Sequence, residues 1–247
     1  MSHKIIAVYG NSGSYKTTTS ISLAHYISAA DSSANVALVC VDNTKPLLPI
    51  IASNERSFSG SLGKVLSVVD FNRDIILKNM YMAGRIGVLA YNVRENANTY
   101  AIASQERIDD LYMQLRHLAD YTIIDCTSDV AASRLTAKAI INADITVELL
   151  SCDLNGLVFD GSQEPILQSE QYGYRDFIRM ISLSEDFKQD EAAMQNALGR
   201  ITGRIPYSRN TAEYFNQGVL LSNGVDDRNY TSSIKSLIKL LTKEDDL

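Results

Sequence analysis

The sequence predicts an α/β protein with three α/β/α layers around a mainly parallel, Rossmann-like, doubly wound sheet. Short apolar runs rich in β-branched residues alternate along the chain with longer segments of helical periodicity. The first of these runs leads through a glycine-bearing loop into a helix, as in a βα unit. The length of 247 residues suits one domain, so residues 1–247 are assigned to a single domain.

The first βα unit is expected between Lys4 and Ala30. Residues 4–9 form a short apolar run that ends at a glycine, which predicts a buried strand. A helical spacing then places apolar residues at Ile21, Leu23, Ala24 and Ile27. The loop between strand and helix reads Gly10-Asn11-Ser12-Gly13-Ser14-Tyr15-Lys16-Thr17-Thr18.

This loop matches the P-loop pattern of phosphate-binding proteins at Gly10, Lys16 and Thr17, with Tyr15 in the place of the second glycine. Backbone N–H groups of such a loop bind phosphate oxygens at the start of the helix. Lys16 would reach the β- and γ-phosphates, and the Thr17 hydroxyl would ligate Mg²⁺. Gly13 retains freedom to take a positive φ. The alternative is a capped helix that follows a strand and binds no phosphate.

The next stretch predicts a second strand at residues 36–41, with Asp42 at its carboxyl end. That edge of a parallel sheet faces the ligand crevice, so Asp42 could contact Mg²⁺ or its water. The alternative is an Asp that stabilises a turn with Asn43 and Thr44. The pattern then predicts an irregular loop at 45–59, helices at 61–67 and 72–80, a strand at 86–91, a polar loop at 92–99 and an amphipathic helix at 104–118.

A second informative strand, at residues 121–125, ends in Asp125 and small polar residues. An apolar strand that ends in Asp is the form of a Walker B segment, whose carboxylate helps to hold Mg²⁺. Asp129 is expected to cap a helix at 130–141. The rest of the chain predicts a strand at 143–151, a helix within 154–172 broken near Gly161 and Pro165, an ambiguous segment at 174–183, a helix at 185–198, a strand at 200–205, and helices at 211–217 and 231–241.

The charge and composition limit the classes of function and the cellular location that the sequence supports. A net charge of −6 and a pI near 5.1 give no broad basic face for non-specific DNA binding, although a local patch is not excluded. No apolar run approaches membrane-spanning length. The three cysteines have no framework spacing, which indicates a reducing, cytoplasmic location and strand-end packing for all three.

The order of these segments resembles the ParA/MinD group of P-loop ATPases. The resemblance rests on YGNSGSYKTTTSISLAHYIS, VALVCVDNTKP, DYTIIDCTSDV, ADITVELLS and GRIPYSRNTAEYFNQGVLL, and it covers most of the chain. It implies the P-loop NTPase fold, ATP and Mg²⁺ as cofactors, and a homodimer. It also implies that Gly10 to Thr18 surround the phosphates, that Lys16, Asp42 and Asp125 are the catalytic residues, that Thr17, Asp42 and Asp125 hold Mg²⁺, and that Pro206 and Tyr207 lie near the adenine.

The chain also departs from this family's pattern. Asn11 stands where the family carries a signature lysine that reaches the partner subunit's nucleotide, and Tyr15 replaces a glycine. Loss of a cation at the phosphates removes transition-state stabilisation, so binding could survive where hydrolysis is weak or absent. Such changes are similar to those in the TadZ/CpaE-like members. The resemblance to them implies a localisation or assembly factor that recruits a protein partner in a Flp/Tad-type pilus or secretion apparatus.

Three other functions stay open at this point. A DNA- or plasmid-partitioning ATPase would need a basic patch. A MinD-like membrane switch would use residues 233–243, whose apolar stripe and lysines could lie on anionic lipid, although a helix docked in the core shows the same stripe. A tyrosine kinase of the same fold would carry a C-terminal tyrosine cluster, whereas the 13 tyrosines here are scattered.

Overall fold

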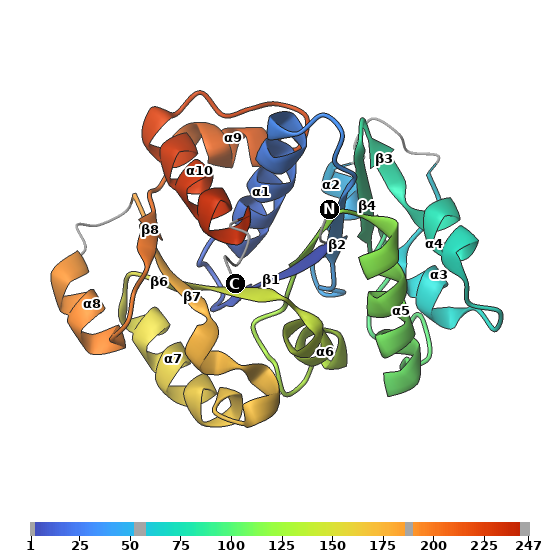
Figure 1. Cartoon of the computed structure of the whole chain (residues 1–247), viewed down its shortest axis with the longest axis horizontal. Helices are drawn as coiled ribbons and strands as arrows, with labels where there is room; N and C mark the ends of the chain where they lie inside the picture. The colour runs from blue at the N-terminus through green and yellow to red at the C-terminus, as the bar shows by residue number, and fades with distance from the viewer. Residues whose placement is uncertain (1–2, 52–57, 186–189, 243–247) are drawn as a thin grey trace.

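The computed structural model describes residues 3–51, 58–185 and 190–242, which form three layers about a central sheet (Figure 1). The sheet has eight strands in the order β3-β4-β2-β5-β1-β6-β7-β8. All neighbours are parallel except β3 and β4, which confirms the predicted α/β class. The strands are β1 (Lys4–Gly10), β2 (Val36–Cys40), β3 (Tyr81–Ala83), β4 (Ile86–Ala90), β5 (Tyr121–Asp125), β6 (Ile145–Ser151), β7 (Ile178–Ser182) and β8 (Gly203–Ile205).

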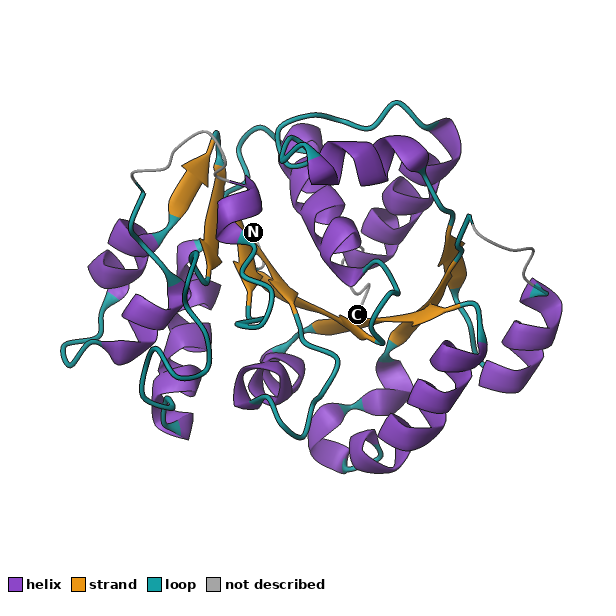
Figure 2. Ribbon diagram, turned by 180° about the vertical axis from the view of Figure 1, so that it is seen from behind, coloured by secondary structure: helices purple, strands orange, loops and turns teal. Residues whose placement is uncertain are grey.

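Helices cover both faces of the sheet (Figure 2). They are α1 (Lys16–Ala30), α2 (Leu48–Ile51), α3 (Leu62–Ser67), α4 (Arg73–Asn79), α5 (Gln105–Leu118), α6 (Arg134–Asn142), α7 (Leu154–Leu167), α8 (Glu191–Leu198), α9 (Arg209–Asn216) and α10 (Arg228–Thr242). Two short 3₁₀ turns, Glu170–Tyr172 and Tyr174–Asp176, connect α7 to β7.

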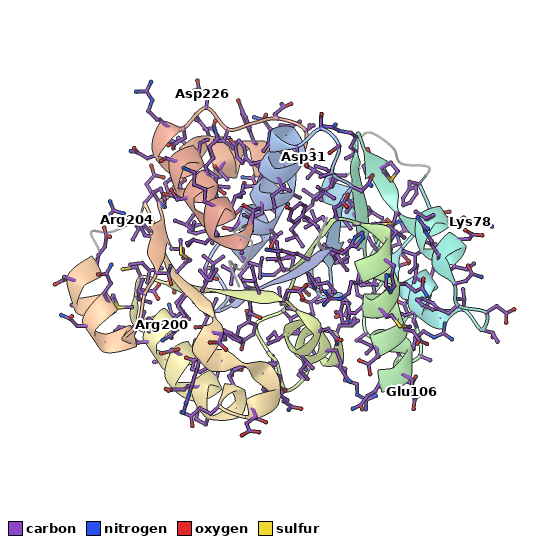
Figure 3. All side chains as sticks on the ribbon, viewed as in Figure 1. Asp31, Lys78, Glu106, Arg200, Arg204 and Asp226 are labelled. Atoms are coloured by element: carbon purple, nitrogen blue, oxygen red, sulfur yellow. The ribbon has the colours of Figure 1, made fainter. Side chains whose placement is uncertain are left out.

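The alternation of side chains along β1 explains the layers. Ile6 and Val8 face the core beneath α1 and α10, whereas Ile5, Ala7 and Tyr9 face the core on the side of α5 and α6. Apolar side chains fill both spaces, and charged ones such as Lys78, Glu106 and Asp226 lie at the periphery (Figure 3). Because β1 is buried on both faces, it reads as a continuous apolar run rather than an alternating one.

Strand β1 lies between β5 and β6, so its carboxyl end is at the centre of the sheet. The chain connects β1 to β2 on one side of β1, and it later continues through β6, β7 and β8 on the other. Ligands of open α/β sheets bind where the strand order reverses in this way. The fold therefore places the loop after β1 at the expected ligand crevice.

The edge of the sheet contains two elements that the sequence analysis missed. β3 forms a three-residue antiparallel hairpin with β4, turned by Gly84 at φ 62°. Helix α2 is a single turn inside the segment predicted as loop 45–59, of which residues 52–57 lie outside the described residues. Both elements are too short to carry a periodic signal.

Two helix boundaries differ from the prediction. α7 is not broken near Gly161; it continues to Leu167, with Pro165 inside its last turn, where the missing N–H removes one hydrogen bond and only two residues of the helix follow. α6 begins at Arg134 rather than residue 130, because the Ser133 side chain caps it. Asp129 instead accepts a 2.9 Å hydrogen bond from the N–H of Ala132 in the turn before the helix.

The carboxyl-terminal third contains the remaining elements. The ambiguous segment 174–183 contains the parallel strand β7, and α9 begins two residues earlier than predicted because Ser208 caps it. The prediction of a helix at 185–198 is met by α8 from Glu191, and residues 186–189 lie outside the described part.

Helix α10, which is described as far as Thr242, packs its apolar side against the core. Ile234, Leu237 and Leu241 are buried and join the core cluster that includes α1 residues. The stripe that could have lain on lipid is thus covered by the protein, as the docked-helix alternative requires; Lys243 lies outside the described residues. Among the described residues, we find no helix whose length and apolar character would let it cross a bilayer.

Candidate functional site

The loop after β1 follows the backbone path of a phosphate-binding loop. Gly10 has φ 143°, and a Cβ there would lie 1.8 Å from the carbonyl oxygen of Leu149 on β6. Gly13 has φ 83°, and Tyr15, which precedes α1, has φ 59° and ψ 27° in the left-handed region. That region costs a residue with a side chain about 1 kcal/mol or more. The chain therefore keeps the loop conformation although Tyr15 has replaced the glycine that would suit it.

Lys16 crosses the mouth of this loop. Its Nζ donates 2.9 Å hydrogen bonds to the carbonyl oxygen of Asn11 and to Oγ of Ser128, in the segment after β5. Burial lowers the pKa of Lys16, the negative charge of Asp125 opposes that shift, and Lys45 adds a smaller lowering. The ammonium group is thus held between the loop and the end of β5, in partly desolvated surroundings that strengthen its attraction for an anion.

Thr17 and Asp125 meet directly. The Thr17 hydroxyl donates a 2.8 Å hydrogen bond to Oδ2 of Asp125, and the Ser20 hydroxyl donates a 3.3 Å bond to Oδ1. Asp125 is 3% exposed, and burial raises its pKa to about 6, against the opposing effects of Thr17 and Lys16. A hydroxyl and a carboxylate are the hard oxygen donors that Mg²⁺ takes from protein.

Asp42 stabilises a turn, as one of its two alternatives predicts, and its contact with Mg²⁺ stays a prediction. Its Oδ1 accepts hydrogen bonds from the Thr44 N–H at 2.7 Å and the Lys45 N–H at 3.2 Å, so it stabilises a turn. It also lines the same cavity as Lys16, Thr17 and Asp125. No cluster of three or more His, Cys, Asp or Glu side chains suited to a metal occurs among residues 3–51, 58–185 and 190–242. A cation here would complete its shell with phosphate and water, as Mg²⁺ commonly does.

The cavity over the loop has a volume of about 390 Å³. One half is polar and contains Lys16, Thr17, Asp42 and Asp125. The other half is formed by the β8–α9 segment and the face of α9. Its lining residues are Ile205, Pro206, Tyr207, Ser208, Thr211, Ala212, Phe215 and Asn216, joined by Tyr230 of α10. The volume and the division into a charged and an apolar half suit a ligand such as a nucleotide.

The structure brings most of the predicted residues to this cavity. Those that line it are Ser12, Gly13, Tyr15, Lys16, Thr17, Thr18, Asp42, Asp125, Pro206 and Tyr207. Gly10, Asn11 and Ser14 do not line it. The Asn11 side chain turns away from the cavity: its Nδ2 donates to Ser151 Oγ at 2.8 Å, and its Oδ1 accepts from the Ser151 N–H at 2.8 Å. Asn11 thus ties the loop to the end of β6.

Of the lining residues that the sequence analysis did not find, three illustrate what it could and could not detect. Lys45 follows Asp42 and adds a second lysine to the polar half, Ser128 follows the Walker B strand, and Thr211 lies in the first turn of α9. The lysine in VDNTKP was a signal, because a cation two or three residues after a strand-end Asp lies at the same edge of the sheet. Thr211 carried no signal, because its position depends on how α9 packs.

Neither a protein-family model nor a curated protein sequence matches the chain. Solved structures do. A ParA family ATPase from Chlorobium tepidum is similar over 98% of this chain and 100% of its own, with a TM-score of 0.77 at 13% identity.

Two further structures were solved with nucleotide. The septum site-determining protein MinD from Pyrococcus horikoshii, in complex with Mg-ADP, matches over 97% of both chains with a TM-score of 0.71 at 14% identity. An ATP complex of McdA from Cyanothece matches over all of both chains with a TM-score of 0.65 at 20% identity. At such identities the likeness establishes the fold alone. The chain therefore has the three-layer P-loop NTPase fold that is found in ParA, MinD and McdA ATPases.

Proposed function

We propose that this chain is a single-domain, ATP-binding protein of the ParA/MinD type that takes Mg²⁺ with its nucleotide. The observation that carries the proposal is the convergence of Lys16, Thr17 and Asp125, from two distant segments, on one end of a cavity of about 390 Å³. Lys16 would neutralise the terminal phosphates, and backbone N–H groups of residues 13–18 would bind their oxygens. Bound Mg²⁺ would supply charge neutralisation at the phosphates, held by Thr17, Asp125 and, through water, Asp42.

The departures in the loop favour binding over turnover. Asn11 is 3% exposed and bonded to Ser151, so its side chain contributes no charge to the cavity or to a partner's nucleotide. Hydrolysis needs charge stabilisation of the transition state, and each missing group of that kind costs orders of magnitude in rate. We expect weak or absent ATP hydrolysis. Nucleotide binding with weak or absent hydrolysis is sufficient for a nucleotide-dependent localisation or assembly factor, for example in a pilus or secretion apparatus of the Flp/Tad type.

A nucleotide-linked homodimer fits the surface beside the loop. Asp153 Oδ1 accepts a 2.6 Å hydrogen bond from the Ser151 hydroxyl and caps α7, so the start of that helix lies next to Asn11. Leu154 and Val158, one turn apart on α7, are 76% and 72% exposed. Light scattering with and without Mg-ATP tests this. Val158→Asp should abolish a nucleotide-dependent dimer, and persistence of the dimer in that variant would move the interface elsewhere.

The competing functions have less support. The buried stripe of α10 argues against a membrane switch that uses this helix, and no observation favours a DNA-binding face on a chain of net charge −6. The three cysteines are free and buried, as expected for packing residues of a cytoplasmic protein.

Calorimetric titration with Mg-ATP is the direct test of nucleotide binding. We expect saturable binding by the wild type, and a loss of at least about 100-fold in affinity for Lys16→Ala, because the cation that faces the phosphates is removed. Lys239→Ala, on the exposed side of α10, is the matched control and should bind as the wild type does. Absence of binding at millimolar nucleotide, or equal binding by Lys16→Ala, would remove the proposal.

A further inference from the structure

A second lysine, Lys45, lies at the end of the cavity that is farthest from its apolar half. Lys45 follows β2, and four strands, β5, β1, β6 and β7, separate β2 from β8, after which the apolar half begins (Figure 1). Asp42, at the end of β2, lines the cavity beside it. A ligand that extends from the β8 side across the start of α1 therefore ends next to Lys45.

The backbone is fixed on both sides of Lys45. Its N–H donates a 3.2 Å hydrogen bond to Oδ1 of Asp42. Pro46 follows and restricts Lys45 to extended conformations. Leu47 and Leu48, which come next, are buried in the core cluster that includes residues of α1. The attachment point of the lysine is thus held in place before a ligand arrives, and binding has to order only the side chain.

The ammonium group of Lys45 is not neutralised by the protein around it. Within residues 3–51, 58–185 and 190–242 it takes part in no hydrogen bond or ion pair. Asp42, the nearest acid in the sequence, directs its Oδ1 to the backbone of the turn instead. Lys16, in contrast, donates to Asn11 and Ser128. Lys45 is therefore the lysine of this cavity whose charge is available to a ligand without breaking a bond.

The charges of Lys16 and Lys45 act on each other across the cavity. Burial is the main cause that lowers the pKa of Lys16, and the positive charge of Lys45 adds to that lowering, while Asp125 and Asp42 oppose it. Two positive charges that face a common space repel each other, and an anion between them removes the repulsion. The pair therefore favours a multiply charged anion that reaches both lysines.

We propose that Lys45 binds the terminal phosphate of the nucleotide in its own subunit and thereby distinguishes a nucleoside triphosphate from a diphosphate. The inference rests on the proposed nucleotide binding and adds a specificity-determining residue to it. Asn11 supplies no charge here, because its side chain is bonded to Ser151 and lies away from the cavity. The second cation at the phosphates comes instead from the segment after β2.

The test is calorimetry of the full chain with Mg-ATP and with Mg-ADP, because the ratio of the two affinities reports the terminal phosphate alone. Wild type should bind ATP at least about tenfold more tightly than ADP, as one charge-assisted hydrogen bond provides. Lys45→Ala should reduce this ratio about fivefold or more and change ADP affinity by less than about twofold. Lys16→Ala should weaken both ligands, because Lys16 also reaches the β-phosphate.

Three controls separate charge from other effects of the substitution. Lys45→Gln keeps a long polar side chain without the charge and should behave as Lys45→Ala does. Lys45→Arg keeps the charge and should retain at least about half of the wild-type ratio. Lys78→Ala, at the exposed end of α4, removes the same charge at the periphery and should leave the ratio unchanged (Figure 3).

The outcomes distinguish this inference from the function on which it rests. An equal ratio in wild type and Lys45→Ala would overturn the role of Lys45, and nucleotide binding by Lys16 would stand. The reduction should be the same at two protein concentrations tenfold apart; a reduction that vanishes on dilution would mean that Lys45 acts on a partner's nucleotide, against the proposal. If neither nucleotide binds, both proposals fall together. Lys45 is exposed, so its variants should fold as the wild type does.

Discussion

The hydroxyl of Thr17 lies 2.8 Å from Oδ2 of Asp125, which joins the first turn of α1 to the carboxyl end of β5 across 108 residues of sequence. The contact couples a helix start, where phosphate would bind, to a buried carboxylate, where a cation would bind. Asp125 is at the same time the most desolvated acid of the cavity, and its pKa is raised to about 6. The pH dependence of stability and of ligand binding should therefore report the protonation state of Asp125.

Replacement of Asp125 should stabilise the ligand-free protein. The folded state holds a proton on Asp125 up to about pH 6, whereas the ordinary value is 3.8, so stability from this group falls as pH rises between these values. Above pH 6 the folded protein bears the full free-energy cost of burying the ionised Asp125 carboxylate. Asp125→Asn removes it, so we expect the free energy of unfolding at pH 7.5 to rise by about 1–2 kcal/mol, below the limit of about 2.7 for two pKa units.

Urea denaturation at pH 4.5 and 7.5 measures this effect. The difference between Asp125→Asn and wild type should be larger at the higher pH, and Asp70→Asn, an exposed acid, should match the wild type at both. A loss of stability at pH 7.5 would show that the carboxylate is better stabilised by Thr17 and Lys16 than we infer.

Nucleotide binding should release a proton near pH 6. A carboxyl with a raised pKa must ionise to hold Mg²⁺, so the affinity for Mg-ATP should decrease as pH falls below 6. Calorimetry at pH 6 in two buffers of different ionisation enthalpy gives the number of protons released. We expect a fraction of one proton for wild type and none for Asp125→Asn. Equal heats in both buffers for the wild type would indicate that Asp125 does not ligate the cation.

Asn11 should be a structural residue. Its amide exchanges two 2.8 Å hydrogen bonds with Ser151 and is nearly fully buried. Asn11→Ala leaves the Ser151 N–H without this partner, so we expect a loss of about 2 kcal/mol in unfolding free energy. Asn11→Lys should be at least as damaging and should not raise ATP hydrolysis. Asn98→Ala, in an exposed turn, is the control, and comparable melting of all three variants would contradict the assignment.

The buried pair of Arg179 and Glu148 predicts a second pH-dependent effect, away from the cavity. Arg179 Nε donates a 2.6 Å hydrogen bond to Glu148 Oε2, and a second carboxylate, Asp160, also pairs with this arginine. Burial raises the pKa of Glu148 to about 7, although Arg179 opposes the shift. Arg179→Met should cost about 3 kcal/mol or more at pH 8, where it leaves buried carboxylates without their cation.

At pH 5 the same substitution should cost less, because Glu148 is then neutral in the folded protein. Denaturation at the two pH values makes the comparison. Arg204→Met removes the exposed pair with Glu191 and should change stability by less than about 1 kcal/mol at either pH. An equal cost for Arg179→Met at pH 5 and pH 8 would mean that Glu148 does not titrate in this range.

Much of the fold and half of the site follow from local sequence. Buried parallel strands are continuous apolar runs, so β1, β2, β4 and β5 were predicted almost to the residue. The chemistry at their carboxyl ends followed with them, because Lys16, Asp42 and Asp125 must share one edge of a parallel sheet. Residues 81–83 gave no comparable signal, since a three-residue edge strand has too few positions to show alternation.

What local sequence could not show was the direction of side chains whose partners are remote. Asn11 turns toward Ser151, 140 positions away, and Tyr15 meets Tyr207 through a contact that exists only when β8 and α1 are in place. Thr211 reaches the cavity for the same reason. The hydrogen bond from Lys16 to Ser128 could not be predicted either, because nothing in the sequence placed the loop after β5 relative to Lys16.

A crystal structure grown with Mg²⁺ and a non-hydrolysable ATP analogue tests the central claim most directly. The account predicts that the triphosphate lies between Lys16 and the start of α1, that Lys16 Nζ exchanges Ser128 Oγ for phosphate oxygens, and that Mg²⁺ takes its place beside Thr17 and Asp125. Density for Lys16 still bonded to Asn11 and Ser128, with no nucleotide in the cavity at saturating analogue, would contradict it.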